Sequence, residues 1–499
     1  MASSLPRSVC LLSIGRTSIR QRPIMPLKAR ISQGALPARG YAVKALESYQ
    51  ENKTSDPDGV LREDDPDDIL FTKKFGLRSL ELNRPKKLNS LNGSMARKLV
   101  LRLKELSKSD LAQVVVIKGA GRAFCAGGDV VALADWNAKG EPVLSDDYFA
   151  LEYKLDHLLA TYNKPLIAYQ DGITMGGGVG LSIHAPFRIA TENTVFAMPE
   201  TTIGFFPEVG ATFFLPRMDG ELGTYLALTS EQLRGVDVFY HGIATHYIHS
   251  STLPTLSERL SELRFKDYAT PNERFAIIAS TIAEYDSGLP STRPAITGAI
   301  RQAIDHCFSA STPLEILSQL EKTREATADE SIKAWADKTI ATIRERSPIG
   351  VAVTLRALRL GKSWNIAQAF RNELEISRVF MRHGDFTEGV NARLVQRSKT
   401  RPNWSPNTLE GVKADDVDAF FAGIDRDTLT FYTSGEGTKY TEYPHAWLGL
   451  PTDQEIEVRL LEGKSGSEIV AEFMKQKNGK VGVREKVEEV VERLRPAKG

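Results

Sequence analysis

The strongest structural signal in this chain lies between Lys164 and Arg217, which read KPLIAYQDGITMGGGVGLSIHAPFRIATENTVFAMPETTIGFFPEVGATFFLPR. An apolar run typical of a buried strand, Pro165 to Tyr169, leads to three glycines, Gly176 to Gly178, and then to a helix-compatible segment. Glycines after a strand let the backbone approach a ligand closely and leave N–H groups free to bind it. The carboxyl groups of Glu200 and Glu208 follow. Free N–H groups near a carboxylate are the elements of acyl-transfer chemistry.

A second segment repeats this strand-to-glycine pattern. Ala112 to Lys118 (AQVVVIK) has the composition of a buried strand and leads into GAGRAFCAGGDV, Gly119 to Val130. Taken alone, each junction is more often an ordinary tight turn than a site. Two such junctions in one domain can each contribute one backbone N–H, and two donors make an oxyanion hole. Together with Glu200 and Glu208, the pattern predicts a functional site.

Three motifs carry a resemblance to a known family: RAFCAGGD (122–129), GITMGGGVGL (172–181) and FAMPETTIGFFPEVGATFFLPR (196–217). They resemble the enoyl-CoA hydratase/isomerase, or crotonase, superfamily, and within it the hydrolases that act on 3-hydroxyisobutyryl-CoA in valine breakdown. The resemblance extends from about Ile69 to Val395. It implies an α/β fold, a crotonase-type spiral of ββα turns with a C-terminal helical domain. It also implies hydrolysis of an acyl-CoA thioester with no metal or redox cofactor.

The resemblance implies roles for individual residues as well. The backbone N–H groups of Ala126 and Gly177 would form the oxyanion hole for the thioester carbonyl, and Glu200 would be the central catalytic glutamate. Glu208, the second catalytic residue, stands where these hydrolases usually have an aspartate. Its side chain is longer by one methylene, which moves the carboxylate by roughly 1.5 Å. Asp135 falls at an acidic position that lines the substrate pocket, together with Gly177, Glu200 and Glu208.

The type of reaction is indicated by a missing side chain. Family hydratases carry a second glutamate two residues after the glycine triplet, where this chain has Gly180. We therefore expect a thioesterase rather than a hydratase. Glu200 would either attack the carbonyl to form a mixed anhydride or act as a general base on water, and the sequence leaves both routes open. An enoyl- or dienoyl-CoA isomerase remains an alternative, since such enzymes also use two acids eight residues apart.

Other catalytic motifs are not supported. The nearest approach to a G-x-S-x-G nucleophile elbow, GLSIH at Gly180 to His184, lacks the final glycine. His241, His246 and His249 have no carboxylate or cysteine at ligand spacing, so we expect structural or surface roles. Cys125 is interpreted as a small buried apolar residue. The three cysteines show no metal spacing, and disulfides are not expected.

The N-terminal segment predicts targeting to the mitochondrial matrix. Residues 1–46 contain eight Arg or Lys and no Asp or Glu, which is typical of a mitochondrial transit peptide. Residues 47–66 are rich in Asp, Pro and Glu and are predicted to be a linker. No run of 18 apolar residues occurs, so no membrane span is expected. The formal net charge is +1, and the whole molecule shows no polyanion-binding signature.

The remaining chain is predicted to have three parts: a crotonase-like core over 67–265, a helical domain over 266–400 and an extension over 401–499. The core alternates short strands (69–73, 114–118, 166–169, 187–190, 195–197) with helices (94–108, 146–162). Apolar residues three and four apart predict helices over 331–346 and 365–381.

The extension is longer than the hydrolases that the sequence resembles need for their reaction. Its last helix carries an apolar stripe of Val483, Val487, Val490, Val491 and Leu494, which either packs on the chain itself or offers a surface to a partner. Fungal and plant proteins similar to this hydrolase also occur in the small subunit of the mitochondrial ribosome. A structural component of that subunit, retaining the hydrolase fold, is therefore the alternative to an enzyme. A homo-oligomer is also left open.

Overall fold

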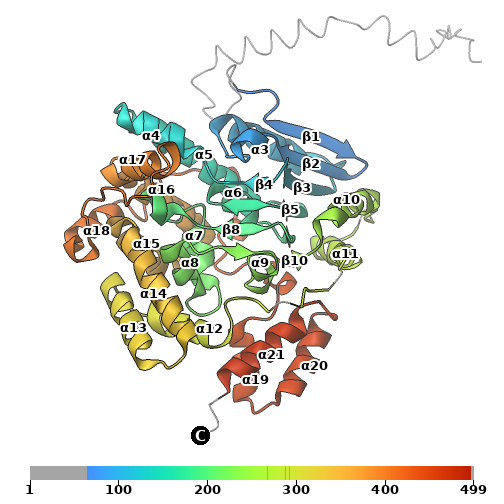
Figure 1. Ribbon diagram of the computed structural model, residues 1–499. Coiled ribbons are helices and arrows are strands. Elements are labelled where there is room, and N and C mark those ends of the chain that lie inside the picture. The colour runs from blue at the N-terminus through green and yellow to red at the C-terminus, as the bar shows by residue number, and fades with distance from the viewer. Residues whose placement is uncertain (1–63, 267, 287, 292, 496–499) are drawn as a thin grey trace, which may run out of the picture. The chain divides into compact units, whose positions relative to one another are not determined.

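The computed structural model describes residues 64–495 except 267, 287 and 292. The predicted transit peptide (1–46) and nearly all of the predicted linker (47–66) lie outside the described residues. The residues that are described belong to one compact unit (Figure 1).

Two sheets form the core. The larger has the order β1-β2-β3-β5-β7-β10, in which β1 and β2 pair antiparallel and the other neighbours pair parallel. The smaller has the order β4-β6-β8-β9. The strands of the larger sheet are β1 (Ile69–Lys74), β2 (Leu77–Leu82), β3 (Val114–Gly119), β5 (Leu166–Gln170), β7 (Phe187–Ala190) and β10 (His246–Tyr247). Those of the smaller are β4 (Ala123–Cys125), β6 (Ile173–Met175), β8 (Val195–Ala197) and β9 (Leu233–Arg234).

The order of the strands is that of a repeated ββα unit. Each of the consecutive pairs β3–β4, β5–β6 and β7–β8 gives its first strand to the larger sheet and its second to the smaller, and helical segments follow each pair. The first of these helices are α4 (Val130–Ala138) and α5 (Pro142–Ala160), and the next is α6 (Gly177–Ile183). This arrangement confirms the predicted α/β class and the predicted ββα order.

Most element boundaries agree with the sequence patterns. The five predicted strands match β1, β3, β5, β7 and β8 to within one residue at either end. The helix predicted over 94–108 is α3 (Gly93–Lys108). The helix predicted over 146–162 is α5, which begins four residues earlier because Pro142 occupies its first turn, where proline is favoured.

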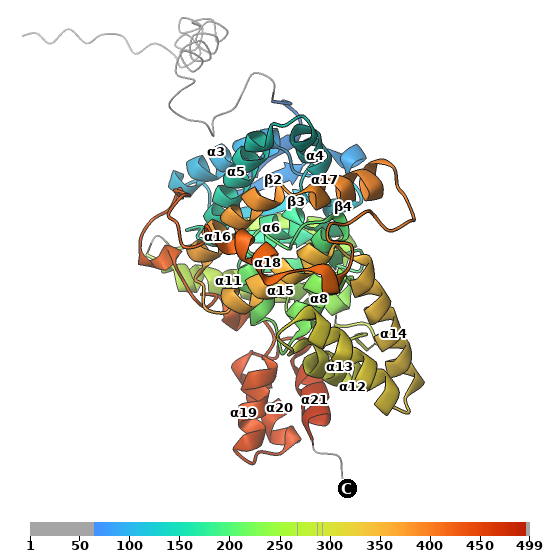
Figure 2. The same cartoon turned by 90° about the vertical axis from the view of Figure 1, so that its left-hand side faces the viewer.

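The second half is helical, as predicted, but it shares its core with the first half. One hydrophobic cluster joins α5 residues such as Tyr153 to α16 residues such as Phe370, so the predicted boundary near 265 is not a boundary of packing. Figure 2 shows α16 beside α5. The helices after β8 are α7 (Ala211–Phe214), α8 (Leu222–Thr229), α9 (Val236–Tyr240), α10 (Leu253–Glu262), α11 (Pro271–Ala283), α12 (Gly298–Phe308), α13 (Pro313–Ala326), α14 (Glu330–Glu345), α15 (Pro348–Gly361), α16 (Ile366–Phe380), α17 (Gly384–Val390) and α18 (Ala414–Phe421).

The extension ends in a small bundle made of α19 (Asp453–Leu461), α20 (Gly466–Gln476) and α21 (Val483–Leu494), drawn in red in Figure 1. The bundle has its own core, in which Val483, Val487, Val490 and Val491 pack with Ile456, Ile469 and Phe473. The predicted apolar stripe of α21 is therefore covered by the chain's own helices and offers no surface to a partner. Among the described residues, no helix is long and apolar enough to cross a membrane.

Candidate functional site

The glycine triplet lies where β6 meets α6. Gly176 has a φ of +47°, and Gly177 begins the helix, so its N–H has no acceptor within the helix. A Cβ atom on Gly178 would lie 2.1 Å from the carbonyl oxygen of Cys125. Glycine at 178 therefore allows the close approach of this turn to the segment after β4, which carries the second glycine motif.

The prediction that the N–H of Ala126 is an oxyanion donor is wrong. Its N–H donates to the carbonyl oxygen of Leu88 at 3.0 Å, so it is already engaged. The N–H of Gly128 has no hydrogen-bond acceptor among the residues that the structure describes. The nitrogen of Gly128 also lies 3.1 Å from where a Cβ on Gly177 would stand. The free pair of donors is thus Gly128 and Gly177, and only one of the two predicted donors is retained.

Glu200 lies beside this pair. It begins the short helix η2 (Glu200–Ile203) and is 4% exposed. Its Oε1 lies 2.8 Å from where a Cβ on Gly176 would stand, and its Oε2 has no hydrogen-bond partner among the described residues. Burial, together with the negative charge of Glu152, raises the pKa of Glu200 to about 8. A buried carboxyl with an unsatisfied oxygen next to unengaged N–H groups is typical of a catalytic site.

Glu208 is also buried, and its Oε2 has no partner in the described part of the chain. Burial raises its pKa well above the ordinary range, and the charges of Glu152, Glu200 and Glu373 add to the shift. Val209, the next residue, has a φ of +56°, which is strained for a β-branched side chain. Glu373 holds the loop in this conformation by accepting the N–H groups of Gly210 (2.7 Å) and Thr212 (2.9 Å).

A further acid at the site, Glu152, was not predicted from the sequence. This residue of α5 is 1% exposed, and its Oε1 lies 2.5 Å from where a Cβ on Gly177 would stand. Burial raises its pKa to about 8. The signal was present in the sequence, because Glu152 lies on the same helical face as the apolar Phe149 and Leu155. An acidic residue on an apolar face is buried when the helix packs.

Asp135, predicted to line the substrate pocket, differs from the other predicted site residues in its exposure. It is exposed on α4, and its carboxylate pairs with Lys139 one turn later at 2.6 Å. The structure therefore brings Gly177, Glu200 and Glu208 together and adds Glu152 and Gly128, while Asp135 is not one of the buried acids.

Aromatic side chains follow Glu200 along the chain and pack on α5, the helix that carries Glu152. Phe205 packs against Phe149, Phe206 and Phe386, with ring centroids 5.4, 5.0 and 5.3 Å apart. All four rings are buried. Such a wall lowers the local dielectric constant, which raises the pKa of the carboxyls and strengthens any hydrogen bond to a developing negative charge.

Other candidate groups do not form sites. Cys125 is fully buried, and burial raises its pKa to about 12, so it is no nucleophile at neutral pH. His241 and His246 are buried, whereas His249 pairs with Glu192 at the surface. In the described residues, no group of three or more His, Cys, Asp or Glu side chains could hold a metal ion.

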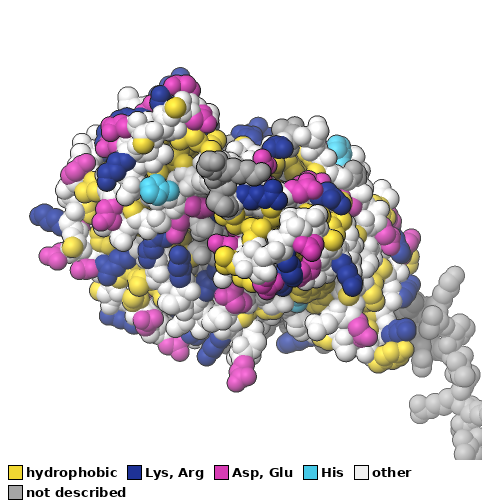
Figure 3. Space-filling view, turned by 90° about the horizontal axis from the view of Figure 1, so that it is seen from below, with side chains coloured by type: hydrophobic (Ala, Val, Ile, Leu, Met, Phe, Trp, Pro, Cys, Tyr) yellow, Lys and Arg dark blue, Asp and Glu magenta, His cyan; other side chains and the backbone are white. Residues whose placement is uncertain are grey.

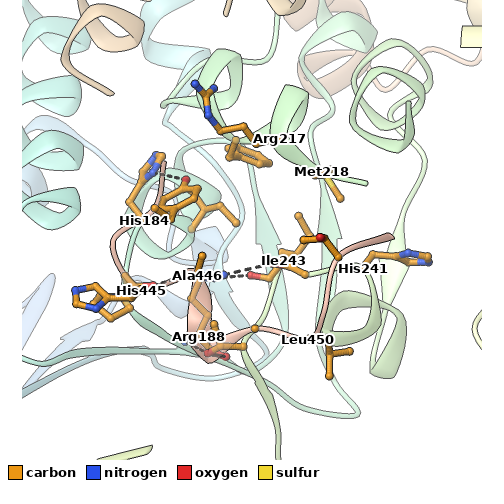
Figure 4. A pocket seen from close by; sticks show the side chains of 18 of the residues that line it. His184, Arg188, Arg217, Met218, His241, Ile243, His445, Ala446 and Leu450 are labelled. Carbon is orange, nitrogen blue, oxygen red and sulfur yellow. Dashed lines mark hydrogen bonds between the residues drawn. The ribbon is translucent and has the colours of Figure 1, made fainter. Parts of the chain in front are cut away.

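A cavity of about 170 Å³ lies at the opposite end of α6 (Figure 4). Its lining includes His184, Arg188 and, from the extension, Tyr443 and His445. His184 and Tyr443 share a hydrogen bond of 2.9 Å, and Arg188 donates to the carbonyl oxygens of Ile243 and Ala185 at 2.7 and 2.8 Å. The bond between His184 and Tyr443 fastens the extension to the core, whereas those of Arg188 lie within the core. The cavity lining includes none of Glu152, Glu200 and Glu208.

The chain is similar to two kinds of known protein. The small ribosomal subunit protein mS47 of Neurospora crassa is 46% identical over 478 residues, which cover 94% of this chain and 92% of that protein. The mitochondrial 3-hydroxyisobutyryl-CoA hydrolase of Danio rerio is 39% identical over 365 residues, which cover 72% of this chain and 91% of the hydrolase.

The fold has a solved counterpart. A carnitinyl-CoA dehydratase from Mycobacterium thermoresistibile superposes with a TM-score of 0.64 at 32% identity, over 74% of this chain and 99% of that one. Residues 77–421 match the family model for enoyl-CoA hydratase/isomerase. With its ββα core and a family match over most of its length, this chain belongs to the enoyl-CoA hydratase/isomerase family.

Proposed function

We propose that this protein hydrolyses an acyl-CoA thioester in the mitochondrial matrix, with 3-hydroxyisobutyryl-CoA as the preferred substrate. One observation carries the proposal: the unengaged N–H groups of Gly128 and Gly177 lie beside the buried carboxyl of Glu200. Two N–H donors can hold the thioester oxygen as it becomes negatively charged, and a carboxylate can attack the carbonyl or activate water.

Glu200 can bring about hydrolysis of the thioester by either of two routes. If Glu200 attacks, the C–S bond breaks to release the CoA thiolate, and water then hydrolyses the mixed anhydride to regenerate Glu200. If Glu200 acts as a base, it takes a proton from water while hydroxide adds to the carbonyl, and that proton goes to the departing thiolate. In both routes Gly128 and Gly177 stabilise the tetrahedral oxyanion, and Glu200 must be ionised to act.

The surroundings of Gly180 favour hydrolysis over hydration. A Cβ atom at this position would lie 2.6 Å from Cβ of Val209 and 2.7 Å from Oδ2 of Asp156. A glutamate at 180, which family hydratases use, does not fit without displacing both neighbours. Gly180→Glu is therefore expected to gain no hydratase activity.

Exposed lysines lie close to the donor loop. Lys86 and Lys87 precede Leu88, whose carbonyl oxygen accepts the N–H of Ala126. They are thus held next to the segment that carries Gly128, where cationic side chains can meet the phosphates of CoA. We expect Lys86→Glu with Lys87→Glu to raise KM and to leave kcat nearly unchanged.

The test is release of free thiol from 3-hydroxyisobutyryl-CoA by purified protein, with Glu200→Gln as the matched control. Hydration of crotonyl-CoA and isomerisation of an enoyl-CoA are measured in parallel. Thiol release that disappears in the variant supports the hydrolase. Isomerisation without thiol release would favour the isomerase alternative, and no turnover of any acyl-CoA by folded protein would contradict both enzyme proposals.

A second function has its own support, namely assembly into the small subunit of the mitochondrial ribosome. The similarity to mS47 of Neurospora crassa covers 94% of this chain and therefore includes the extension, whereas the hydrolase matches 72%. The view of the molecule from below shows acidic and basic side chains interspersed, without a broad basic face (Figure 3). A protein-rich contact fits that view better than one made largely with RNA phosphates.

Sedimentation of mitochondrial extracts tests this second function. A component of the small subunit is expected to migrate with that subunit at low and moderate salt, and Glu200→Gln should migrate with it. A chain found only in the fractions of free proteins would contradict the assembly role.

A further inference from the structure

The loop that carries Glu208 is held by two side chains directly after that residue. Glu373 accepts the N–H of Gly210 at 2.7 Å. The carbonyl oxygen of Val209 lies 3.0 Å from Nε2 of His184. A Cβ on Gly210 would lie 2.3 Å from the same nitrogen, so glycine at 210 leaves room for the imidazole ring. Because Val209 has a φ of +56°, which is strained for a β-branched residue, the loop keeps this conformation only where such contacts hold it.

The two bonds of His184 define its tautomer. The side chain is buried, and burial lowers its pKa to about 4, so the ring is neutral at pH 7 and only one of its nitrogens carries a hydrogen. A carbonyl oxygen can only accept, so the bond to Val209 requires that hydrogen on Nε2. Nδ1 is then an acceptor, and the hydroxyl of Tyr443, 2.9 Å away, donates to it. Two hydrogen bonds thus connect Tyr443 through His184 to Val209.

Tyr443 belongs to the extension, beyond residue 421, where the match to the family model ends. The extension is held against the core just before this residue. Phe431 stacks on His157 of α5 with ring centroids 3.8 Å apart, and Arg217 donates to the carbonyl oxygen of Thr441 at 2.9 Å. The hydroxyl of Tyr443 is therefore presented to the core by an anchored segment.

We propose that Tyr443 is a positioning residue: its hydroxyl fixes the tautomer of His184, which in turn holds the loop of Glu208 in its strained conformation. The inference rests on the proposed hydrolase function, and it gives the extension a part in the reaction. Without this hydroxyl, the ring hydrogen of His184 can move to Nδ1, and Nε2 would then face the carbonyl oxygen of Val209 as a second acceptor. Two acceptors repel each other, so the loop would relax and the carboxyl of Glu208 would shift, which a reacting geometry tolerates poorly.

Tyr443→Phe and Tyr440→Phe are matched substitutions in the full-length chain. Both tyrosines belong to the extension, their ring centroids are 5.8 Å apart, and both rings pack edge-on against Phe213. The hydroxyl of Tyr440 donates to the carbonyl oxygen of Ala160 at 3.4 Å rather than to His184. Each substitution removes one hydroxyl and its hydrogen bond, so we expect similar, small decreases in the temperature of unfolding.

The two variants should differ in the rate of thiol release from 3-hydroxyisobutyryl-CoA. We expect Tyr443→Phe to lower kcat by about fivefold or more with little change in KM, because the loop acts on the reacting groups. Tyr440→Phe should stay within about twofold of the wild type. Equal kcat values for the two variants would overturn the proposal. So would a loss of kcat in each variant that parallels its loss of stability.

Nitrogen NMR spectroscopy of the isotope-labelled protein tests the link without any substrate, with the signals of His184 identified by their absence in His184→Gln. In the wild type at neutral pH, Nε2 should have the chemical shift of a protonated nitrogen and Nδ1 that of an unprotonated one. The two shifts should approach each other in Tyr443→Phe and stay unchanged in Tyr440→Phe. Unchanged shifts in Tyr443→Phe would overturn the proposal. If the wild type hydrolyses no acyl-CoA but the shifts move as expected, the proposed function has failed and the link from Tyr443 to Val209 remains.

Discussion

At the scale of single residues, the site is defined by acids that the fold forces into an apolar interior. Glu152, Glu200 and Glu208 are each at most 5% exposed, and each has an oxygen without a hydrogen-bond partner in the described chain. Burial raises the pKa of each of them. The fold therefore loses stability to hold these groups, as expected where activity and stability compete.

Glu200→Gln should stabilise the protein more as the pH rises. The pKa of Glu200 is raised from 4.5 to about 8, so the folded state binds the proton more tightly than the unfolded state. The free-energy cost of ionising the buried carboxyl is absent below the ordinary pKa, grows between the two pKa values and is complete above the raised one. One pKa unit corresponds to about 1.4 kcal/mol, so the gain at high pH is on the order of 2–4 kcal/mol. Denaturant titrations at about pH 5 and about pH 9 measure it, and an equal effect at both pH values would refute the account.

Glu208→Asp should lower kcat by about tenfold, because a shift of one methylene exceeds what a reacting geometry tolerates. The hydrolases that the sequence resembles usually have aspartate here. The loop of this chain, with Val209 at a φ of +56° and Glu373 bound to Gly210 and Thr212, is built around glutamate. Steady-state kinetics of the wild type and Glu208→Asp measure this difference in kcat. A variant faster than the wild type would show that the longer side chain impairs this chain.

At the scale of elements, sequence patterns predicted strands and helices well, because the burial period of each segment is local. The predictions failed where the answer depends on packing between segments. The motif CAGGD offers consecutive N–H groups, and the sequence does not tell which of them are engaged. In the structure the N–H of Ala126 donates to Leu88, whereas that of Gly128 has no acceptor among the described residues. Glu152 was missed because its approach to Gly177 depends on how α5 crosses α6.

Gly180→Ala tests that crossing. The added methyl would lie 2.7 Å from Oδ2 of Asp156 on α5 and 2.6 Å from Cβ of Val209, so we expect a loss of about 1–3 kcal/mol from overpacking. Gly384→Ala is the matched control, because a Cβ there meets nothing within 4 Å and the residue lies in a helix. The control should be neutral or slightly stabilising. Similar free energies of unfolding for the two variants, measured with urea, would argue against the tight α5–α6 contact.

At the scale of the whole molecule, ion pairs tie the C-terminal bundle to the rest of the chain. Lys486 of α21 lies 2.8 Å from Asp219, before α8, and 2.7 Å from Asp453 of α19. Asp453 also meets Arg301 of α12 at 3.1 Å and Arg493 at 2.8 Å. Burial would raise the pKa of Asp453, but the charges of Lys486, Arg301 and Arg493 outweigh it and lower the pKa. This contribution to stability is therefore present at neutral pH and is lost on acidification.

Lys486→Met should destabilise the protein by about 3–5 kcal/mol, because it removes a buried cation and leaves the half-buried Asp219 unpaired. Lys338→Met removes an exposed pair with Glu231 and should cost less than about 1 kcal/mol. Thermal unfolding of the two variants side by side provides the measurement. A Lys486 variant no less stable than the Lys338 variant would mean that the bundle is held by other contacts.

The most direct test of the central claim is the rate of thiol release from 3-hydroxyisobutyryl-CoA as a function of pH, for the wild type and Glu200→Gln. The pKa of Glu200 is about 8, so the wild-type rate should rise with pH and level off above that value. The variant should remain at background throughout. Wild-type rates in Glu200→Gln would contradict the claim that Glu200, beside Gly128 and Gly177, carries out hydrolysis.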